Sequence, residues 1–116
     1  MAEITAEAYA DLRNYIKSNW QYIELQDDQS NKIVRLSNSD SRVTSTIEGD
    51  NVKITVVVKG SDSDITAPVN FAKSAIYNVA TDGSPFSVES FTPFTMQSES
   101  DELTVVHTIQ IPKKVV

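Results

Sequence analysis

The stretch Val43–Lys59, VTSTIEGDNVKITVVVK, decides the fold class, because apolar and polar side chains alternate along most of its length. The alternation has a period of two on both sides of Gly49–Asn51, which is the pattern of a half-buried strand. Gly, Asp and Asn readily adopt the positive φ angles of a tight turn, and β-branched residues pack well on a pleated sheet. The stretch therefore predicts a β-hairpin that carries on one face Val43, Ser45, Ile47, Val52, Ile54, Val56 and Val58.

The chain before the hairpin carries a clear helical pattern over about residues 5–19. Thr5 is a suitable N-cap, because its hydroxyl accepts hydrogen bonds from the free N–H groups of a first helical turn. Glu7 places a negative charge at the positive end of the helix dipole. Apolar side chains at spacings of three and four residues share one helix face, and they are Tyr9, Leu12, Ile16 and Trp20. Because a short isolated helix is marginal in water, we expect this face to dock on the rest of the domain.

Between residues 21 and 112 the sequence alternates between short strand-like runs and polar turns. Besides the hairpin, these runs are Tyr22–Leu25, Lys32–Leu36, Phe86–Val88, the Pro93-containing Ser90–Ser98 and Leu103–Ile111. This spacing is typical of an antiparallel β-sandwich or a small barrel. We therefore predict a mainly β (α+β) fold of about seven short strands with one N-terminal helix. The 116 residues form a single domain, 1–116, with the helix at about 5–19 and the β body at about 21–112.

The segment Phe71–Val79 fits two periodicities. A period of two places on one face Phe71, Ala75, Tyr77 and Val79. A helical period instead groups Phe71, Ala72, Ala75, Ile76 and Val79. The short length of the segment and the TDGSP turn directly after it favour a strand.

Composition excludes several classes of function. A net charge of -6 repels phosphate backbones, so we expect no nucleic-acid partner. The absence of cysteine removes disulfides, thiolate nucleophiles and cysteine-ligated metals. No apolar run approaches the roughly 20 residues that span a bilayer. Residues 1–10 lack the basic and apolar pattern of a secretory signal, so synthesis in the cytoplasm and no membrane association are expected.

Catalytic and metal-binding motifs are weak in this sequence. His107 is the only histidine, and it lies in the apolar register of the last run, where a structural role is favoured over that of a general base. Acidic residues gather in the turns, and Asp62 with Asp64 is the best candidate for a calcium site. Their spacing matches no EF-hand loop. We predict no enzyme activity, no catalytic residues, no cofactor and no metal ion.

The remaining candidates concern surfaces. The stretch around Phe86, Phe91, Phe94 and Met96 is richer in large apolar groups than one edge strand requires. It either closes the core or forms a contact patch for neighbouring subunits, where aromatic residues and Met are enriched. A carbohydrate-binding or protein-binding β module is the competing interpretation. Tyr22 and Tyr77 would be its aromatic candidates.

Three stretches resemble small proteins encoded among the virion genes of tailed bacteriophages and prophages of Gram-positive bacteria. They are ITAEAYADLRNYIKSNWQYIELQD at 4–27, KIVRLSNSDSRV at 32–43 and SPFSVESFTPFTMQSESDELTVVHTIQIP at 84–112. The resemblance implies a virion structural protein: a capsid decoration or head accessory protein, a head–tail connector or a tail component. It implies other virion proteins as partners and a homo-oligomer, with a trimer around a local threefold as one arrangement. Arg42, in the SNSDSR loop, and the four apolar residues above would then make the contacts.

Overall fold

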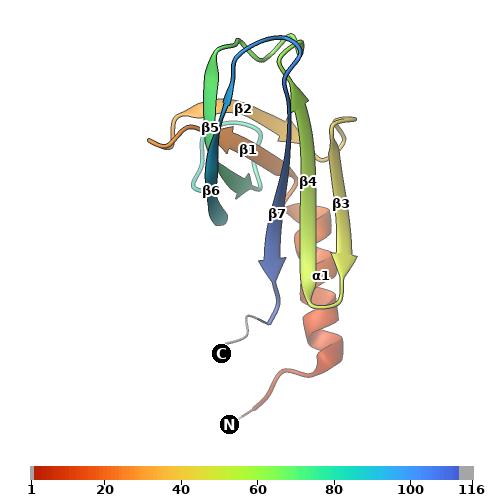
Figure 1. Cartoon of the computed structure of the whole chain (residues 1–116). Coiled ribbons are helices and arrows are strands. Elements are labelled where there is room, and N and C mark those ends of the chain that lie inside the picture. Colours follow the sequence, from red (N-terminus) through yellow and green to blue (C-terminus); the bar gives the residue numbers. More distant parts are fainter. Residues whose placement is uncertain (1, 113–116) are drawn as a thin grey trace.

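The computed structural model describes residues 2–112, and Met1 and residues 113–116 of the predicted domain lie outside this range. The described chain contains one helix and seven strands in two antiparallel sheets, as predicted (Figure 1). The elements are α1 (Ala6–Asn19), β1 (Tyr22–Gln26), β2 (Lys32–Ser37), β3 (Val43–Glu48), β4 (Asn51–Lys59), β5 (Val69–Tyr77), β6 (Ser87–Met96) and β7 (Glu102–Gln110). Of the two predicted architectures, the structure has the β-sandwich-like arrangement.

The sheets have the strand orders β2-β1-β5-β6 and β3-β4-β7. In Figure 1 the three-stranded sheet runs the length of the molecule, the four-stranded sheet lies near its upper part, and α1 lies beside the lower part of β3 and β4. The molecule is accordingly elongated, with extents of 54 × 30 × 25 Å. The chain crosses between the sheets after β2, after β4 and after β6.

The predicted hairpin is confirmed as β3 and β4, which pair in register from Val43 opposite Val56 to Glu48 opposite Asn51. Gly49 adopts the expected positive φ of 59° in the turn. The predicted apolar face of β4 is buried and faces the core between the sheets. The largest fully buried side chains in that core include Phe71, Ile23, Leu25, Ile76 and Met96.

The helix begins and ends where the sequence predicts. The Thr5 hydroxyl accepts a hydrogen bond from the Ala8 N–H at 3.2 Å, so Thr5 is the N-cap. The predicted apolar face is only partly buried: Ile16 is buried, whereas Leu12 remains 42% exposed. Since α1 contacts β3 and β4 along one side and leaves the rest of its surface to solvent, Ile16 is its main anchor.

The segment Val69–Tyr77 is a strand, as the preferred interpretation predicts, but its predicted face is wrong. A register shift between Phe71 and Lys73 in the pairing of β5 with β6 interrupts the alternation. Phe71 therefore faces the core, whereas Ala75 and Tyr77, beyond the irregularity, lie on the opposite face from Phe71. A β-bulge is a local backbone feature that a strict period of two cannot represent.

The two runs predicted around Phe86–Val88 and Ser90–Ser98 form one strand, β6. Pro93 lies within it, and β6 is an edge of the four-stranded sheet, as the proline predicts. β6 and β7 are thus the edges of two different sheets. They contact each other along one side of the molecule.

Candidate functional site

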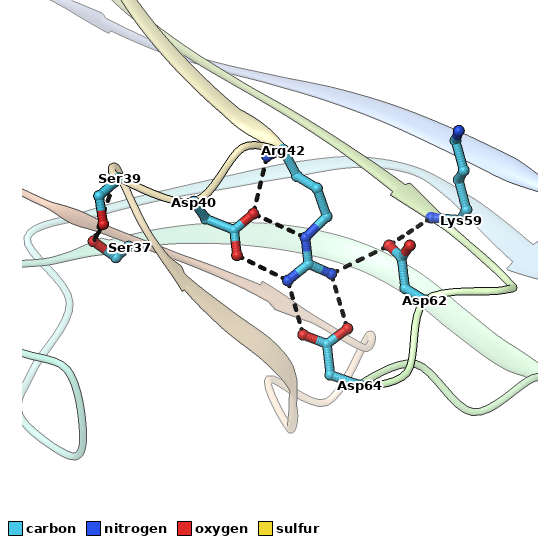
Figure 2. A network of polar contacts seen from close by, with 7 residues as sticks. All are labelled: Ser37, Ser39, Asp40, Arg42, Lys59, Asp62 and Asp64. Carbon is cyan, nitrogen blue, oxygen red and sulfur yellow. Dashed lines mark hydrogen bonds and ion pairs between the residues drawn. The ribbon is translucent and has the colours of Figure 1, made fainter.

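Arg42 lies at the centre of an ion-pair network rather than on an open surface. Its guanidinium binds both oxygens of Asp40, both oxygens of Asp64 and one oxygen of Asp62, at 2.8–3.2 Å (Figure 2). Hydrogen bonds from Arg42 lower the pKa of Asp40 to about 2 and also lower the pKa of Asp64. Asp64 and Asp40 in turn raise the pKa of Arg42 above its ordinary value. The guanidinium is committed to internal partners.

The same network contains Asp62 and Asp64, the candidates for a calcium site. The Asp62 oxygen that binds Arg42 also accepts from the Lys59 N–H, and Asp64 forms a bidentate pair with Arg42. The Arg42 guanidinium therefore occupies one oxygen of Asp62 and both oxygens of Asp64, which a calcium ion would need as ligands. Within residues 2–112, no group of three or more His, Cys, Asp and Glu side chains is arranged to hold a metal ion.

The four apolar contact candidates divide between surface and core. Phe86 is 48% exposed, and Phe91 and Phe94 are partly buried against the core. Met96 is fully buried and belongs to the core, so it cannot contact a neighbouring subunit. The stretch thus closes the core at one end and meets solvent at the other. These residues and Arg42 do not make up a single surface.

His107 is fully buried between the sheets, on the apolar register of β7 that the sequence predicts. Its ring nitrogens meet two hydroxyls, Ser74 Oγ at 2.7 Å from Nδ1 and Ser87 Oγ at 2.8 Å from Nε2. Burial lowers the pKa of His107 to about 4, so the imidazole is neutral at physiological pH. Both hydrogen-bonding partners are hydroxyls and neither is a carboxylate, which gives His107 a structural role joining β7 to β5 and β6.

The two tyrosine candidates share one face, since Tyr22 and Tyr77 lie directly opposite each other in the β1–β5 pairing. Tyr77 is nevertheless buried, because the Arg35 guanidinium lies 3.5 Å from its ring centroid. Arg35 also binds Glu24 at 3.0 Å and donates to the carbonyl oxygens of Val79 and Asp82. This buried cluster on the outer face of the four-stranded sheet holds down the segment after β5. Tyr77 is not available to a ligand.

A pocket of about 410 Å³ opens beside Tyr22, at the end of α1. Its lining comes from the end of the helix, the start of β1 and the segments that flank the loop between β5 and β6: Tyr15, Asn19, Trp20, Gln21, Tyr22, Asn78, Val79, Ala80 and Phe86. Trp20 and Phe86 meet edge to face, with ring centroids 5.1 Å apart and an interplanar angle of 71°. We call this site the aromatic pocket.

A groove of about 340 Å³ lies between the edge strands β6 and β7. It is lined by Phe91, Thr92, Leu103, Thr104, Val105 and Val106. Val106 is 45% exposed. Apolar side chains and a free strand edge thus occur together on this side of the molecule.

No family model, curated protein or solved structure matches this chain. The described residues contain no helix that is long and apolar enough to cross a membrane.

Sequence reasoning missed most of the aromatic pocket. The helical spacing places Trp20 on the docking face of the helix. Its ring does pack partly against the core, but it also lines the pocket beside Phe86. Tyr15 and Asn78 carried no signal, because they are 63 residues apart and polar residues at a helix end or after a strand are common. Only the convergence of three segments distinguishes them.

Proposed function

We propose that the protein is a non-catalytic structural protein of a tailed bacteriophage particle, a capsid decoration or head accessory protein that binds the assembled shell. The resemblance to virion proteins supports the class of function, and the edge of β7 supports the mode of action. Of the four edge strands in the described chain, β7 is the one that combines a length of nine residues with no proline, no register shift and no lysine or arginine. This observation carries the proposal.

Edge strands expose unpaired N–H and C=O groups, and proteins protect them with charges, proline, bulges or short length. β2 carries Lys32 and Arg35, and its pairing with β1 shifts in register. β6 contains Pro93, and its pairing with β5 also shifts. β3 has six residues and ends at Glu48, which forms an ion pair with Lys53. Three edges are therefore protected.

β7 lacks these features, apart from Glu102 at its first residue. It pairs with β4 over nine residues without a shift, and it contains no proline, lysine or arginine. Asp101 O accepts a hydrogen bond from Gly60 N, and Ile111 N donates one to Asp50 O. The backbone N–H and C=O groups of the odd-numbered residues of β7 therefore point toward β4, and those of the even-numbered residues point away from the sheet edge. The backbone N–H of Thr108 donates a hydrogen bond to the Glu89 carboxylate. The backbone groups that remain available for pairing with another strand are therefore those of Thr104 and Val106.

A strand of a neighbouring virion subunit adds to the three-stranded sheet at this position, and its apolar side chains fill the groove beside Phe91 and Leu103. Backbone hydrogen bonds supply affinity in this mode of recognition, and alternate side chains supply specificity. The net charge of -6 favours an arrangement in which most of the surface faces solvent. Contacts between copies around a local threefold are what the resemblance to virion proteins implies.

The test is co-sedimentation of the purified protein with phage particles that lack it. We expect the protein to sediment with expanded heads, and we expect Val106→Lys to abolish this binding, because a lysine at the edge opposes strand pairing. Thr46→Lys is the matched control, since Thr46 lies on the same outer face at the protected β3 edge. It should bind like the unmodified protein.

Other outcomes distinguish the alternatives. Sedimentation with tails or with isolated necks instead of heads would assign the protein to a tail component or a head–tail connector. Sedimentation with none of these particles would refute a structural role in the virion. Equal binding by Val106→Lys and the unmodified protein would refute the β7 edge as the contact.

A further inference from the structure

The aromatic pocket is lined by large aromatic side chains of the kind that usually pack in a protein core. Four of the nine Trp, Tyr and Phe residues of the chain line it. Two of them leave much of their rings in solvent, Tyr15 with 60% and Phe86 with 48% of the residue exposed. Exposed aromatic rings that converge on one hollow offer apolar faces to a ligand, whereas scattered ones do not.

The lining of the aromatic pocket is uncharged. In a chain with 22% charged residues, the pocket contains no Asp, Glu, Lys or Arg. A phosphate, a carboxylate or an amine would lose its hydration there without gaining an opposite charge. The pocket therefore selects against ionic ligands.

Three carboxamides supply the polar part of the lining. Asn19 Nδ2 donates to Tyr15 O and Gln21 Nε2 donates to Ser18 O, both at 2.9 Å, and these bonds orient the two amides. Within the described residues, no hydrogen bond engages the amide oxygens of Asn19 and Gln21 or the amide group of Asn78. Each amide can donate and accept, which matches hydroxyl groups that also do both.

From this combination we infer that the aromatic pocket binds a neutral sugar, one hexopyranose unit of a glycan. The C–H groups of a pyranose ring form an apolar face that stacks on Phe86 or Tyr15, and its hydroxyls pair with the carboxamides. The volume of about 410 Å³ lies within the range of about 300–1,000 Å³ typical of small-molecule sites. This inference goes beyond the proposed role in a particle and does not depend on it.

The experiment is an NMR titration of the ¹⁵N-labelled full chain with methyl glycosides of glucose, galactose, mannose, N-acetylglucosamine and rhamnose. Concentrations should saturate a millimolar site. We expect at least one glycoside to shift the Trp20 indole signal and the side-chain amide signals of Gln21 and Asn78. Sodium sulfate at the same concentrations should leave these signals unchanged, because the lining has no charge.

Two variants locate the site. Asn78→Ala and Tyr15→Ala alter exposed side chains, so both should fold, and each should weaken sugar binding by about three- to tenfold through the loss of one polar or stacking contact. Asn14→Ala and Leu12→Ala are matched controls, because they alter exposed residues of α1 that do not line the pocket. They should leave the affinity unchanged.

Three results would overturn the inference. The first is the absence of shifts with every glycoside, and the second is shifts confined to residues outside the pocket. The third is pocket shifts whose midpoint is the same in Asn78→Ala, Tyr15→Ala and the unmodified protein. A failure here would leave binding to phage heads intact, whereas loss of head binding through Val106→Lys would leave the sugar titration intact.

Discussion

At the scale of single residues, His107 shows how burial and hydrogen bonding settle a role that residue type leaves open. Histidine is the usual general base near neutral pH, but this imidazole has no solvent contact and lies between the hydroxyls of Ser74 and Ser87. The hydroxyls satisfy both ring nitrogens of the neutral form. Charging the ring would place an uncompensated cation between the sheets.

The lowered pKa of His107 predicts that the protein loses stability in mildly acidic solution. The pKa is about 4 in the folded state against 6.5 for a histidine in water, so between these pH values the unfolded chain binds a proton that the folded chain does not. Stability therefore falls as the pH drops from about 6.5 to about 4, by about 3 kcal/mol in full. Urea unfolding at several pH values across this range measures the loss.

The His107→Gln variant is the control for this prediction, because glutamine does not titrate. Its free energy of unfolding should change much less between about pH 6.5 and about pH 4. Glu89 acts in the opposite direction, since burial raises its pKa and the folded state keeps its proton to higher pH. Measuring both proteins in a Glu89→Gln background removes that contribution. Asp40 and Asp64 have lowered pKa values and lose their stabilisation only below about pH 4. Parallel pH profiles for the two proteins would contradict the prediction.

Gly60 occupies a position where no other residue fits. A Cβ atom there would lie 1.9 Å from the carbonyl oxygen of Ser98, which belongs to the backbone and cannot turn away. We expect Gly60→Ala to destabilise the fold by about 2–3 kcal/mol, as overpacking does elsewhere. Thermal or urea unfolding would measure this difference.

Gly49 provides the control for Gly60. It has a φ of 59°, but a Cβ added there would meet no atom within 4 Å, so its requirement is conformational and not steric. Gly49→Asn should be nearly neutral, because asparagine tolerates this backbone region. Gly60→Ala within about 0.5 kcal/mol of the unmodified protein would show that the β6–β7 turn moves to accept the methyl group.

At the scale of elements, the Arg42 network joins two of the three connections that cross between the sheets. Asp40 precedes β3 on the connection from β2, and Asp62 with Asp64 lies on the connection from β4 to β5 (Figure 2). A single guanidinium thus fixes where both connections run. Its fork geometry allows two bidentate pairs at once, which an ammonium group cannot form.

We therefore expect Arg42→Lys to lower the free energy of unfolding by about 1–2 kcal/mol at low salt, through loss of charge-assisted hydrogen bonds. The difference should shrink in 1 M NaCl, where the Debye length is about 3 Å. Lys53→Gln is the control, because its partner Glu48 has a side chain that is 60% exposed, and it should change stability by less than about 0.5 kcal/mol. Equal effects of the two substitutions would refute a special role for the network.

At the scale of the whole molecule, the chain path makes the two sheets interdependent. The four-stranded sheet takes strands from both halves of the chain, and so does the three-stranded sheet, with three crossings between them. Neither sheet is a continuous segment that could form without the other. His107, which reaches from β7 to β5 and β6, adds a direct link between them.

This path predicts a single cooperative unfolding transition. Trp20 fluorescence reports the junction of α1 with the aromatic pocket, and far-ultraviolet circular dichroism reports the sheets as a whole. In guanidinium chloride the two signals should have the same midpoint and slope, as in other small two-state domains. An earlier fluorescence transition would show instead that the helix and the pocket open while the sandwich persists.

The sequence by itself determined the local elements: the capped helix, the β3–β4 hairpin with its buried face, the strand preference of the segment after Pro68, and the edge position implied by Pro93. These features are encoded between residues a few positions apart, in periodicity, capping and turn chemistry. The tertiary structure alone decided that Met96 is core, that Arg42 is enclosed by aspartates, and that β5 changes face at a bulge. It also decided that Tyr15 and Asn78 line one pocket and that β7 is left as the open edge. Each depends on which distant segments pack together, and a pattern of alternating side chains specifies that a face is buried without specifying what covers it.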